Sequence, residues 1–227
     1  PATVTYVQAV DGGLGKSKSE YRDAFMALKI NADGKETSAI ELFKTKMRFQ
    51  GVTWGNNNMA VFYEESYANR KLQMSRYNPS TGKTDSIFSR SSNDEYSDIG
   101  EPLTKKNEFG RQSLLLINEK VLILSASGAS DEGDMPLIQT FDINTGKKRL
   151  LWQCKAPYYE YLVKMIDPIK LSFITARESQ KEITNYYLHT TVKKQKTEIA
   201  LTTFVSPYTQ LEGVSRQKIS YKRADGI

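Results

Sequence analysis

Two short stretches of this chain carry charged side chains that could bind the charged groups of another molecule. Arg177-Glu178 follows an apolar run, and a guanidinium can hold a carboxylate through two parallel hydrogen bonds. Glu64-Glu65 offers two neighbouring carboxylates, which suit the three donors of an ammonium group. Adjacent residues of a strand point to opposite faces, so a structural role is the alternative for the glutamates. A structural Arg–Glu pair is the alternative for the other stretch.

Two further segments have side chains that suit contact with a partner. Tyr158-Tyr159-Glu160 could line a peptide-binding surface, with packing of a loop against a neighbouring blade as the alternative. Residues 90–100 include Asp94, Glu95 and Asp98 and are expected to form an acidic loop. That loop either is solvated or reaches toward a partner domain.

The single histidine and the single cysteine exclude most catalytic relays and metal sites. His189 lies in the alternating run 186–190 with no partner histidine, so a structural or solvent-facing role is expected. Cys154 can form neither an intrachain disulfide nor a Cys-rich zinc site, and we expect a small buried or half-buried side chain. The sequence therefore predicts no catalytic residue, no metal site and no cofactor in this chain.

Composition limits the class of protein. The 227 residues are 39% hydrophobic and 26% charged, so the chain can bury a core. The net charge of +6 is spread out, and the longest basic stretch, 193–196, is too short to predict nucleic-acid binding. No apolar run approaches the roughly 18 residues of a membrane span. The start lacks Met and signal-peptide features and falls within an expected strand, which indicates a piece of a longer protein.

Short apolar runs separated by turn residues recur along the chain and predict strands. Residues 72–77 alternate apolar and polar side chains, which is typical of a strand with one buried face. Asn118-Glu119-Lys120 between two apolar runs predicts a tight hairpin. No segment sustains a helical period, so the expected fold class is all-β.

An internal repeat narrows the fold. Residues 29–35, 77–83 and 141–147 each follow an apolar strand with Asn or Asp, then Gly, then Lys. Residues 187–193 are a degenerate copy, which is followed by an expected strand at 198–204. Residues 89–112 have few apolar side chains and are expected to be a loop insertion. A repeat of about 40–50 residues is typical of the blades of a β-propeller, which pack face to face.

The sequence thus predicts a β-propeller, in the form of a partial ring of about four four-stranded blades. The blades are expected at about 2–43, 47–88, 112–152 and 161–204. An open arc cut from a larger propeller has two uncovered apolar ends, so we expect the isolated chain to associate with itself.

Several stretches carry a resemblance to a known family. RFQGVTWG lies at 48–55, GASDEGDMP at 128–136, APYYE at 156–160 and ISYKRADG at 219–226. Together with segments 175–179 and 185–187, they resemble the propeller domain of the prolyl-oligopeptidase family of serine peptidases. Within that family, the chain most resembles the glutamyl-endopeptidase branch, whose members are often labelled dipeptidyl or acylaminoacyl peptidases. The resemblance runs from about residue 11 to residue 226.

The resemblance implies that the propeller selects peptides and that a separate domain carries out catalysis. In that family the stretch matched by 219–227 crosses from the propeller into an α/β-hydrolase domain with a Ser-Asp-His triad. This chain has no Gly-x-Ser-x-Gly elbow, and its one histidine precedes that point. Residues 1–218 would then be a propeller fragment, inactive by itself, that gates and positions peptides for its own C-terminal hydrolase domain.

The resemblance also suggests roles for individual residues. Dipeptidyl peptidases of the wider family hold a substrate's free amine with paired glutamates, which Glu64-Glu65 could match. A glutamyl-type branch needs a cation for an acidic side chain, which Arg177 could supply.

Two alternatives to the peptidase hypothesis stay open. One is a stand-alone propeller that acts as a protein-interaction scaffold. The other is an enzyme with a carboxylate site in the propeller channel.

Overall fold

The computed structural model describes residues 2–13, 15, 18–30, 38–192, 195–208, 210, 213–214, 217, 219, 221–222 and 224. These residues form eighteen β-strands and no α-helix. Within this described part, no helical segment has the length and apolarity that crossing a bilayer requires. The all-β prediction is confirmed.

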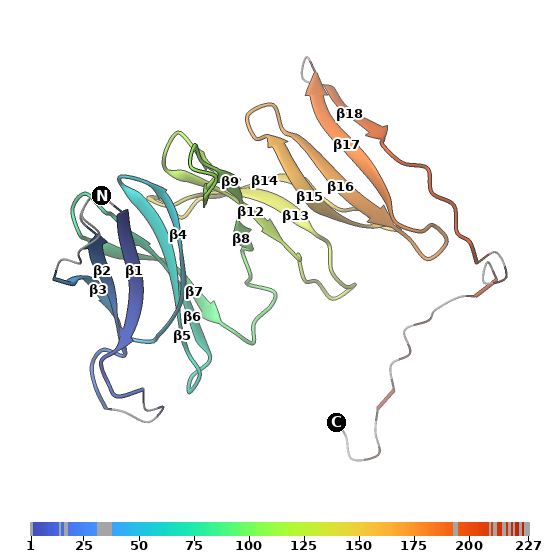
Figure 1. Ribbon diagram of the computed structural model, residues 1–227. Helices are drawn as coiled ribbons and strands as arrows, with labels where there is room; N and C mark the ends of the chain where they lie inside the picture. The colour runs from blue at the N-terminus through green and yellow to red at the C-terminus, as the bar shows by residue number, and fades with distance from the viewer. Residues whose placement is uncertain are drawn as a thin grey trace.

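Four antiparallel sheets follow one another along the chain and are arranged in an arc (Figure 1). The first sheet has three strands, in the order β1 (Ala2–Ala9), β2 (Asp23–Ile30) and β3 (Ile40–Thr45). The second has four, in the order β4 (Arg48–Asn56), β5 (Met59–Ser66), β6 (Lys71–Tyr77) and β7 (Thr84–Ser91).

The third and fourth sheets continue this meander. The third contains β11 (Leu116–Ile117), β12 (Val121–Ala126), β13 (Leu137–Asp142) and β14 (Lys148–Gln153), with β8 (Glu101–Pro102) beside β12. A short ribbon joins β9 (Thr104–Lys106) to β10 (Gln112–Leu114). The fourth contains β15 (Tyr159–Asp167), β16 (Ser172–Glu178), β17 (Asn185–Val192) and β18 (Gln195–Ala200).

Adjacent sheets pack face to face through three hydrophobic clusters, as blades of a propeller do. On β5, Ala60 and Phe62 pack with Phe25 and Phe43 of the first sheet. The alternate residues, such as Val61, belong to a second cluster with the third sheet. Consecutive residues of β5 are buried because both faces of its sheet are covered. The structure is therefore a partial β-propeller, and the predicted fold class is confirmed.

The third cluster joins the last two sheets. Ile123 of β12 and Ile138 of β13 pack with Phe173 of β16, and Trp152 lies against this cluster. The rings of Trp152 and Phe173 meet edge to face with centroids 5.7 Å apart. The fourth sheet is thus held on the third by one of its faces.

The predicted turn repeat has one conformation in two of its copies. Ser80 and Thr81 donate backbone N–H groups to Asn78 Oδ1, and Gly82 donates to the Asn78 carbonyl. Asp142 accepts from residues 144–146 in the same way. Gly82 and Gly146 have φ values of 70° and 68°, which a side chain disfavours. The copy at 29–35 lies largely outside the described residues.

The hairpin predicted at Asn118-Glu119-Lys120 is confirmed, since β11 and β12 flank it. Asn118 and Glu119 both have positive φ, at 48° and 62°. Such a pair of left-handed residues is characteristic of the tight turns that join twisted strands.

Two local expectations were wrong, and one strand was not predicted. Segment 89–112 is not one loop, because β7 extends to Ser91 and β8 and β9 pair with other strands. The strand expected at 198–204 is β18, which starts and ends earlier. Strand β15 was not predicted, because its run has two register shifts against β16 and breaks simple alternation. The crossing predicted at 219–227 lies mostly outside the described residues.

An ion-pair cluster connects the first two sheets. The side chain of Asp11 is fully buried and lies 2.8 Å from both Arg22 Nη1 and Arg48 Nη2. Arg48 also contacts Asp23 Oδ1 at 2.8 Å, and Asp23 Oδ2 accepts from the Phe49 N–H. The hydrogen bond from Arg22, aided by those from Arg48 and Gly13, lowers the pKa of Asp11 to about 2.

We expect Asp11→Asn to lower the melting temperature at neutral pH and to weaken its dependence on acid. The Asp11 pKa is lower in the folded chain than its ordinary 3.8, so its stabilisation is present above that value and is lost as pH falls toward 2. Thermal unfolding of the wild-type chain and of Asp11→Asn across this pH range should give melting temperatures that become equal at low pH. The change Glu108→Gln, at an exposed residue, is the control. A difference in melting temperature between the wild type and Asp11→Asn that stays constant with pH would contradict the lowered pKa of Asp11.

We expect Phe43→Ala to lower the free energy of unfolding by about 3–5 kcal/mol, because it opens a cavity between two sheets. Phe43 is 7% exposed, and its ring centroid lies 4.4 Å from that of Phe62. Phe109→Ala, at a residue 78% exposed, is the control and should change it by less than about 0.5 kcal/mol. Denaturant titration measures both changes, and equal effects would be inconsistent with this packing.

Candidate functional site

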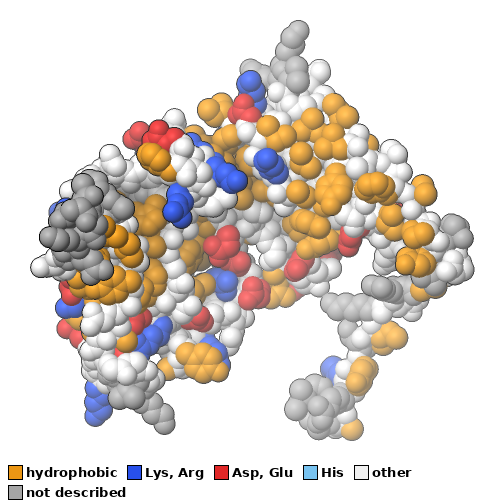
Figure 2. Space-filling view, in the orientation of Figure 1, with side chains coloured by type: hydrophobic (Ala, Val, Ile, Leu, Met, Phe, Trp, Pro, Cys, Tyr) orange, Lys and Arg blue, Asp and Glu red, His pale blue; other side chains and the backbone are white. Residues whose placement is uncertain are grey.

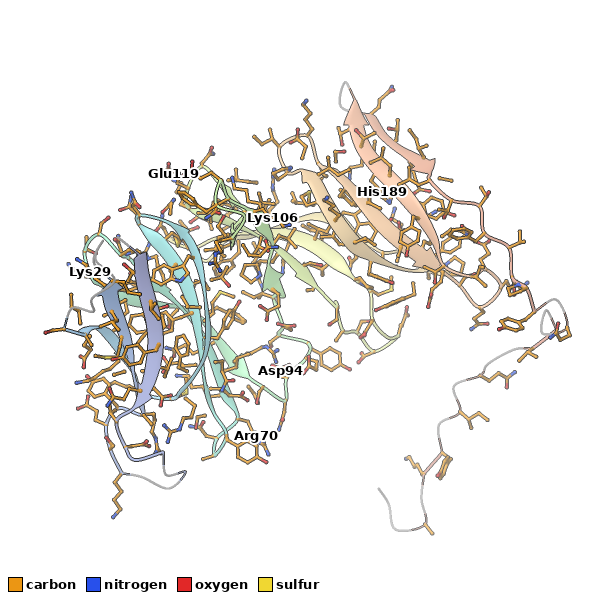
Figure 3. The ribbon with its side chains drawn as sticks, viewed as in Figure 1. Lys29, Arg70, Asp94, Lys106, Glu119 and His189 are labelled. Carbon is orange, nitrogen blue, oxygen red and sulfur yellow. The ribbon has the colours of Figure 1, made fainter. Side chains whose placement is uncertain are left out.

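Five polar side chains from all four strands of the last sheet meet on the face that packs against the third sheet. They are called the Glu160 network and consist of Glu160 on β15, Thr175 and Arg177 on β16, His189 on β17, and Glu198 on β18. Antiparallel register places Glu160 opposite Arg177 and places His189 opposite Glu198. Figure 3 labels His189 within this sheet.

Glu160 is the centre of the network and is 5% exposed. Its Oε1 accepts a 2.5 Å hydrogen bond from Thr175 Oγ1 and lies 2.8 Å from His189 Nε2. Its Oε2 accepts from Arg177 Nε at 2.9 Å. Burial raises the pKa of Glu160, but hydrogen bonds from His189, Arg177 and Thr175 outweigh burial and hold the pKa below its usual value. The buried carboxylate of Glu160 is therefore charged, and both of its oxygens have hydrogen-bond partners.

Arg177 connects the buried centre to the surface. Its Nη1 donates to Glu198 Oε1 at 2.7 Å, and its Nη2 donates to Glu198 Oε2. The guanidinium carbon lies 4.0 Å from the ring centroid of Tyr187 and 5.2 Å from that of Tyr158. Burial opposes the charge, yet the bonds to Glu198 and Glu160 raise the pKa of Arg177 above its usual value.

His189 packs as an aromatic ring as well as a polar one. Its ring stacks on Phe173 with centroids 4.7 Å apart and planes 7° from parallel. Trp152 meets it from the third sheet at 5.8 Å. This geometry agrees with the expected structural role, although the contact with Glu160 gives the histidine a polar partner that the sequence did not reveal.

An open cleft of about 440 Å³ lies over the network where β14 meets the fourth sheet. Its lining residues are Trp152, Gln153, Lys155, Tyr158, Glu160, Arg177, His189, Lys196, Thr197 and Glu198. Aromatic rings and charges of both signs thus border one hollow. Such a surface can bind a short peptide through stacking and ion pairs.

The network also has the donor types of a metal site. One atom each of Glu160, His189 and Glu198 lies within 4.8 Å of the others. Arg177, however, donates to both carboxylates, so a divalent cation would have to compete with a guanidinium already in place. The arrangement therefore fits an ion-pair network better than a metal centre.

Cys154 supports this site through the backbone. Its Sγ donates to the Tyr158 carbonyl at 3.0 Å and accepts from the Glu160 N–H at 3.1 Å. Burial raises the pKa of the thiol, and the residue is 2% exposed. The expected buried role is confirmed, and the thiol helps to position Glu160.

The structure brings three of the residues singled out from the sequence, Tyr158, Glu160 and Arg177, to the cleft. Glu178 points to the other face of the sheet, where its Oε2 accepts from Thr184 Oγ1 at 2.5 Å. Tyr159 lies opposite Glu178 in the register and is 41% exposed. Both line a second open hollow of about 580 Å³ on that face.

Glu64 and Glu65 lie on β5 in the second sheet, away from this cleft. Glu64 is 6% exposed and accepts from the Met47 N–H and from Gln73 Nε2, both at 2.9 Å. Glu65 is opposite Arg48 and Leu72 in the register, and its side chain faces the other way. The two carboxylates therefore do not converge in this structure.

Sequence reasoning singled out Glu160 beside the two tyrosines, but it did not single out Thr175 and Glu198 as site residues. The signal that could have found them is charge or polarity at alternate positions in consecutive strands, which places them on one face. That signal needs the register of β15, which was not predicted, and of β18, whose predicted bounds were wrong.

The packing of the sheets defines the class of the chain, a β-propeller domain, and comparison with known proteins adds named relatives. No family model matches the chain. Over its whole length it is 33% identical to "Probable glutamyl endopeptidase, chloroplastic" of Oryza sativa subsp. japonica and 30% identical to the Arabidopsis thaliana protein of the same name. It spans 26% and 25% of those proteins. The predicted resemblance to glutamyl endopeptidases is confirmed, and the chain corresponds to about a quarter of their length.

Solved structures with weaker similarity were also found. The propeller domain of a trilobed protease from Pyrococcus furiosus has a TM-score of 0.43 and 10% identity, with 87% of this chain and 53% of that one covered. An acylaminoacyl peptidase from Pyrococcus horikoshii has a TM-score of 0.42 and 10% identity, with coverages of 86% and 30%.

We expect Arg177→Met to lower the free energy of unfolding by about 3 kcal/mol, because Glu160 would keep its buried charge without its cation. The double variant Arg177→Met with Glu160→Gln should recover part of this loss, since the buried charge is removed as well. Denaturant titration of the wild-type chain, the two single variants and the double variant measures the difference. Additive effects of the two changes would contradict a direct interaction.

Proposed function

We propose that this chain is the propeller segment of a serine peptidase and that it gates and positions peptides for an α/β-hydrolase domain on the same polypeptide. The observation that carries the proposal is the similarity of the whole chain to a quarter of proteins named glutamyl endopeptidase. The remaining length of such proteins has room for a separate catalytic domain. The chemistry would then belong to that domain, and the propeller would select what reaches it.

The architecture suits selection by size. Each sheet is fixed to the next by a buried cluster, so the arc resists opening at any one interface. Rigid sheets placed around an entrance exclude folded proteins and admit flexible chains. Specificity of this kind needs no reactive group in the propeller.

The cleft over the Glu160 network is our candidate for contact with the peptide. Arg177 now holds Glu198, which is 38% exposed at its side chain, so an acidic substrate side chain could replace it on the guanidinium. Tyr158 would flank that position. Roles for Glu178, Tyr159, Glu64 and Glu65 in substrate binding stay predictions, and both oxygens of Glu64 already have partners.

The test uses the longer polypeptide and one cleavage sequence in two settings, a short flexible peptide and a folded domain. We expect kcat/KM to be about tenfold or more higher for the peptide, which corresponds to about 1.4 kcal/mol. The same domain carrying an unfolding mutation is the matched control and should be cut like the peptide. Equal cleavage of folded and unfolded domains would refute gating.

Absence of any peptidase activity in the longer polypeptide would favour the interaction scaffold instead.

Self-association is a separate proposal that rests on the uncovered outer face of the fourth sheet, where Tyr161, Tyr186 and Ile199 are 40%, 39% and 53% exposed. Figure 2 shows hydrophobic side chains gathered over this sheet. Light scattering of the chain at increasing concentration would detect such association.

A further inference from the structure

Glu64 differs from the other buried acids of the described residues in having no cation beside it. The side chains of Asp11, Asp23 and Glu160 are 0%, 8% and 6% exposed, and each contacts an arginine at 2.8 or 2.9 Å. Glu64 is 6% exposed, yet its oxygens accept only from neutral groups, a backbone N–H and a side-chain amide. Buried charges in proteins are normally paired or bound to a metal ion.

The Glu64 carboxylate can accept further ligands. Its Oε2 accepts one hydrogen bond from the Met47 N–H, and its Oε1 accepts one from Gln73 Nε2, both at 2.9 Å. A carboxylate has about four acceptor positions on its two oxygens. Each oxygen of Glu64 therefore keeps a position for another partner.

A polar group on the facing sheet also has no partner. Thr45 is 2% exposed, and its Oγ1 has no hydrogen-bond partner among the described residues. Thr45 lies two residues after Phe43 on one face of β3, as Glu64 lies two residues after Phe62 on one face of β5. The rings of Phe43 and Phe62 pack with centroids 4.4 Å apart, and the bond from Met47 to Glu64 follows directly. The Thr45 hydroxyl and the Glu64 carboxylate are thus on facing surfaces of the first two sheets.

An open hollow of about 550 Å³ gives solvent access to this place. Glu64 and Ser75 line it, and so do Lys44 and Lys46, the two neighbours of Thr45. Ser75 is 2% exposed and lies on the same face as Glu64, because it is opposite Phe62 in the register. A carboxylate and two hydroxyls are therefore available at one position between the sheets.

The other charged side chains that line the hollow are in ion pairs. These pairs are Lys44 with Glu41, Lys46 with Glu20, and Asp85 with Arg76. The charge of Glu64 is the one that has no counter-charge among the described residues. Oxygen ligands favour a hard cation, and a single negative charge is balanced by a single positive one.

We propose that Glu64 and the hydroxyls of Thr45 and Ser75 bind a monovalent metal cation, Na⁺ or K⁺, between the first two sheets. The cation supplies to Glu64 the counter-charge that arginines supply to the other buried acids. It also gives Thr45 Oγ1 a partner, since a hydroxyl oxygen can coordinate a cation. This site is separate from the peptide selection proposed above and does not depend on it.

Hydrogen exchange of the Met47 amide in the longer polypeptide tests the site, because this N–H donates to Glu64. The two conditions are NaCl or KCl and N-methylglucamine chloride of equal ionic strength. At a metal-ion concentration about ten times the dissociation constant, we expect the amide to exchange about tenfold more slowly than in N-methylglucamine. Amides of β16 in the fourth sheet are the internal control and should keep their rates.

Three variants separate coordination from a general effect of salt. Glu64→Gln should remove the difference between the two conditions. Glu65→Gln changes the neighbouring carboxylate, whose side chain faces the other way, and is the matched control that should keep the difference. Thr45→Val removes no hydrogen bond, so it should fold as the wild type does, yet the slowing should fall to about twofold as the cation binds more weakly.

Equal exchange of the Met47 amide in Na⁺, K⁺ and N-methylglucamine would overturn the proposal and would leave water as the partner of Thr45. A metal-ion effect that persists in Glu64→Gln would overturn it too, because it would not come from this carboxylate. The measurement does not use peptidase activity, so failure of the cation site and failure of gating are distinguishable.

Discussion

The need to bury both faces of each small sheet is the constraint on which this structure depends. Strand β5 shows it most directly, since Ala60 and Phe62 face one neighbouring sheet while Met59 and Val61 face the other. A sheet with two apolar faces has no stable form alone, so every interior sheet requires a neighbour on each side. The arc, the three clusters and the cleft between the last two sheets all follow from this requirement.

The same constraint explains how far the sequence could predict the fold. Residues 72–77 alternate clearly, and the Asn/Asp-to-Gly turns recur, so the strand positions and the repeat could be derived from local rules. Strand β15 could not, because its two register shifts against β16 depend on pairing with a partner distant in sequence. Segment 89–112 has a loop-like composition, yet Ile99 within it is 2% exposed and belongs to the second cluster.

The candidate site shows a different limit. Arg177, Tyr158 and Glu160 could be selected by residue type. Thr175 and Glu198 become significant only when four strands are in register. Glu160 lies in a buried position that it could not occupy as a charge without Arg177 and Thr175. The network is therefore a property of the assembled sheet, and Glu198 is its exposed end.

The strands of the first, second and fourth sheets lie side by side in the order in which they occur in the sequence, as Figure 1 makes visible. Each of these sheets is thus one uninterrupted stretch of polypeptide, closed by hairpins, and needs no later residue to complete its own ladder. Non-local pairing is what slows the folding of most β proteins, and here it is largely replaced by local pairing. A chain of this kind is suited to growing in the order of its synthesis, with each new sheet becoming stable as it packs on the sheet before it.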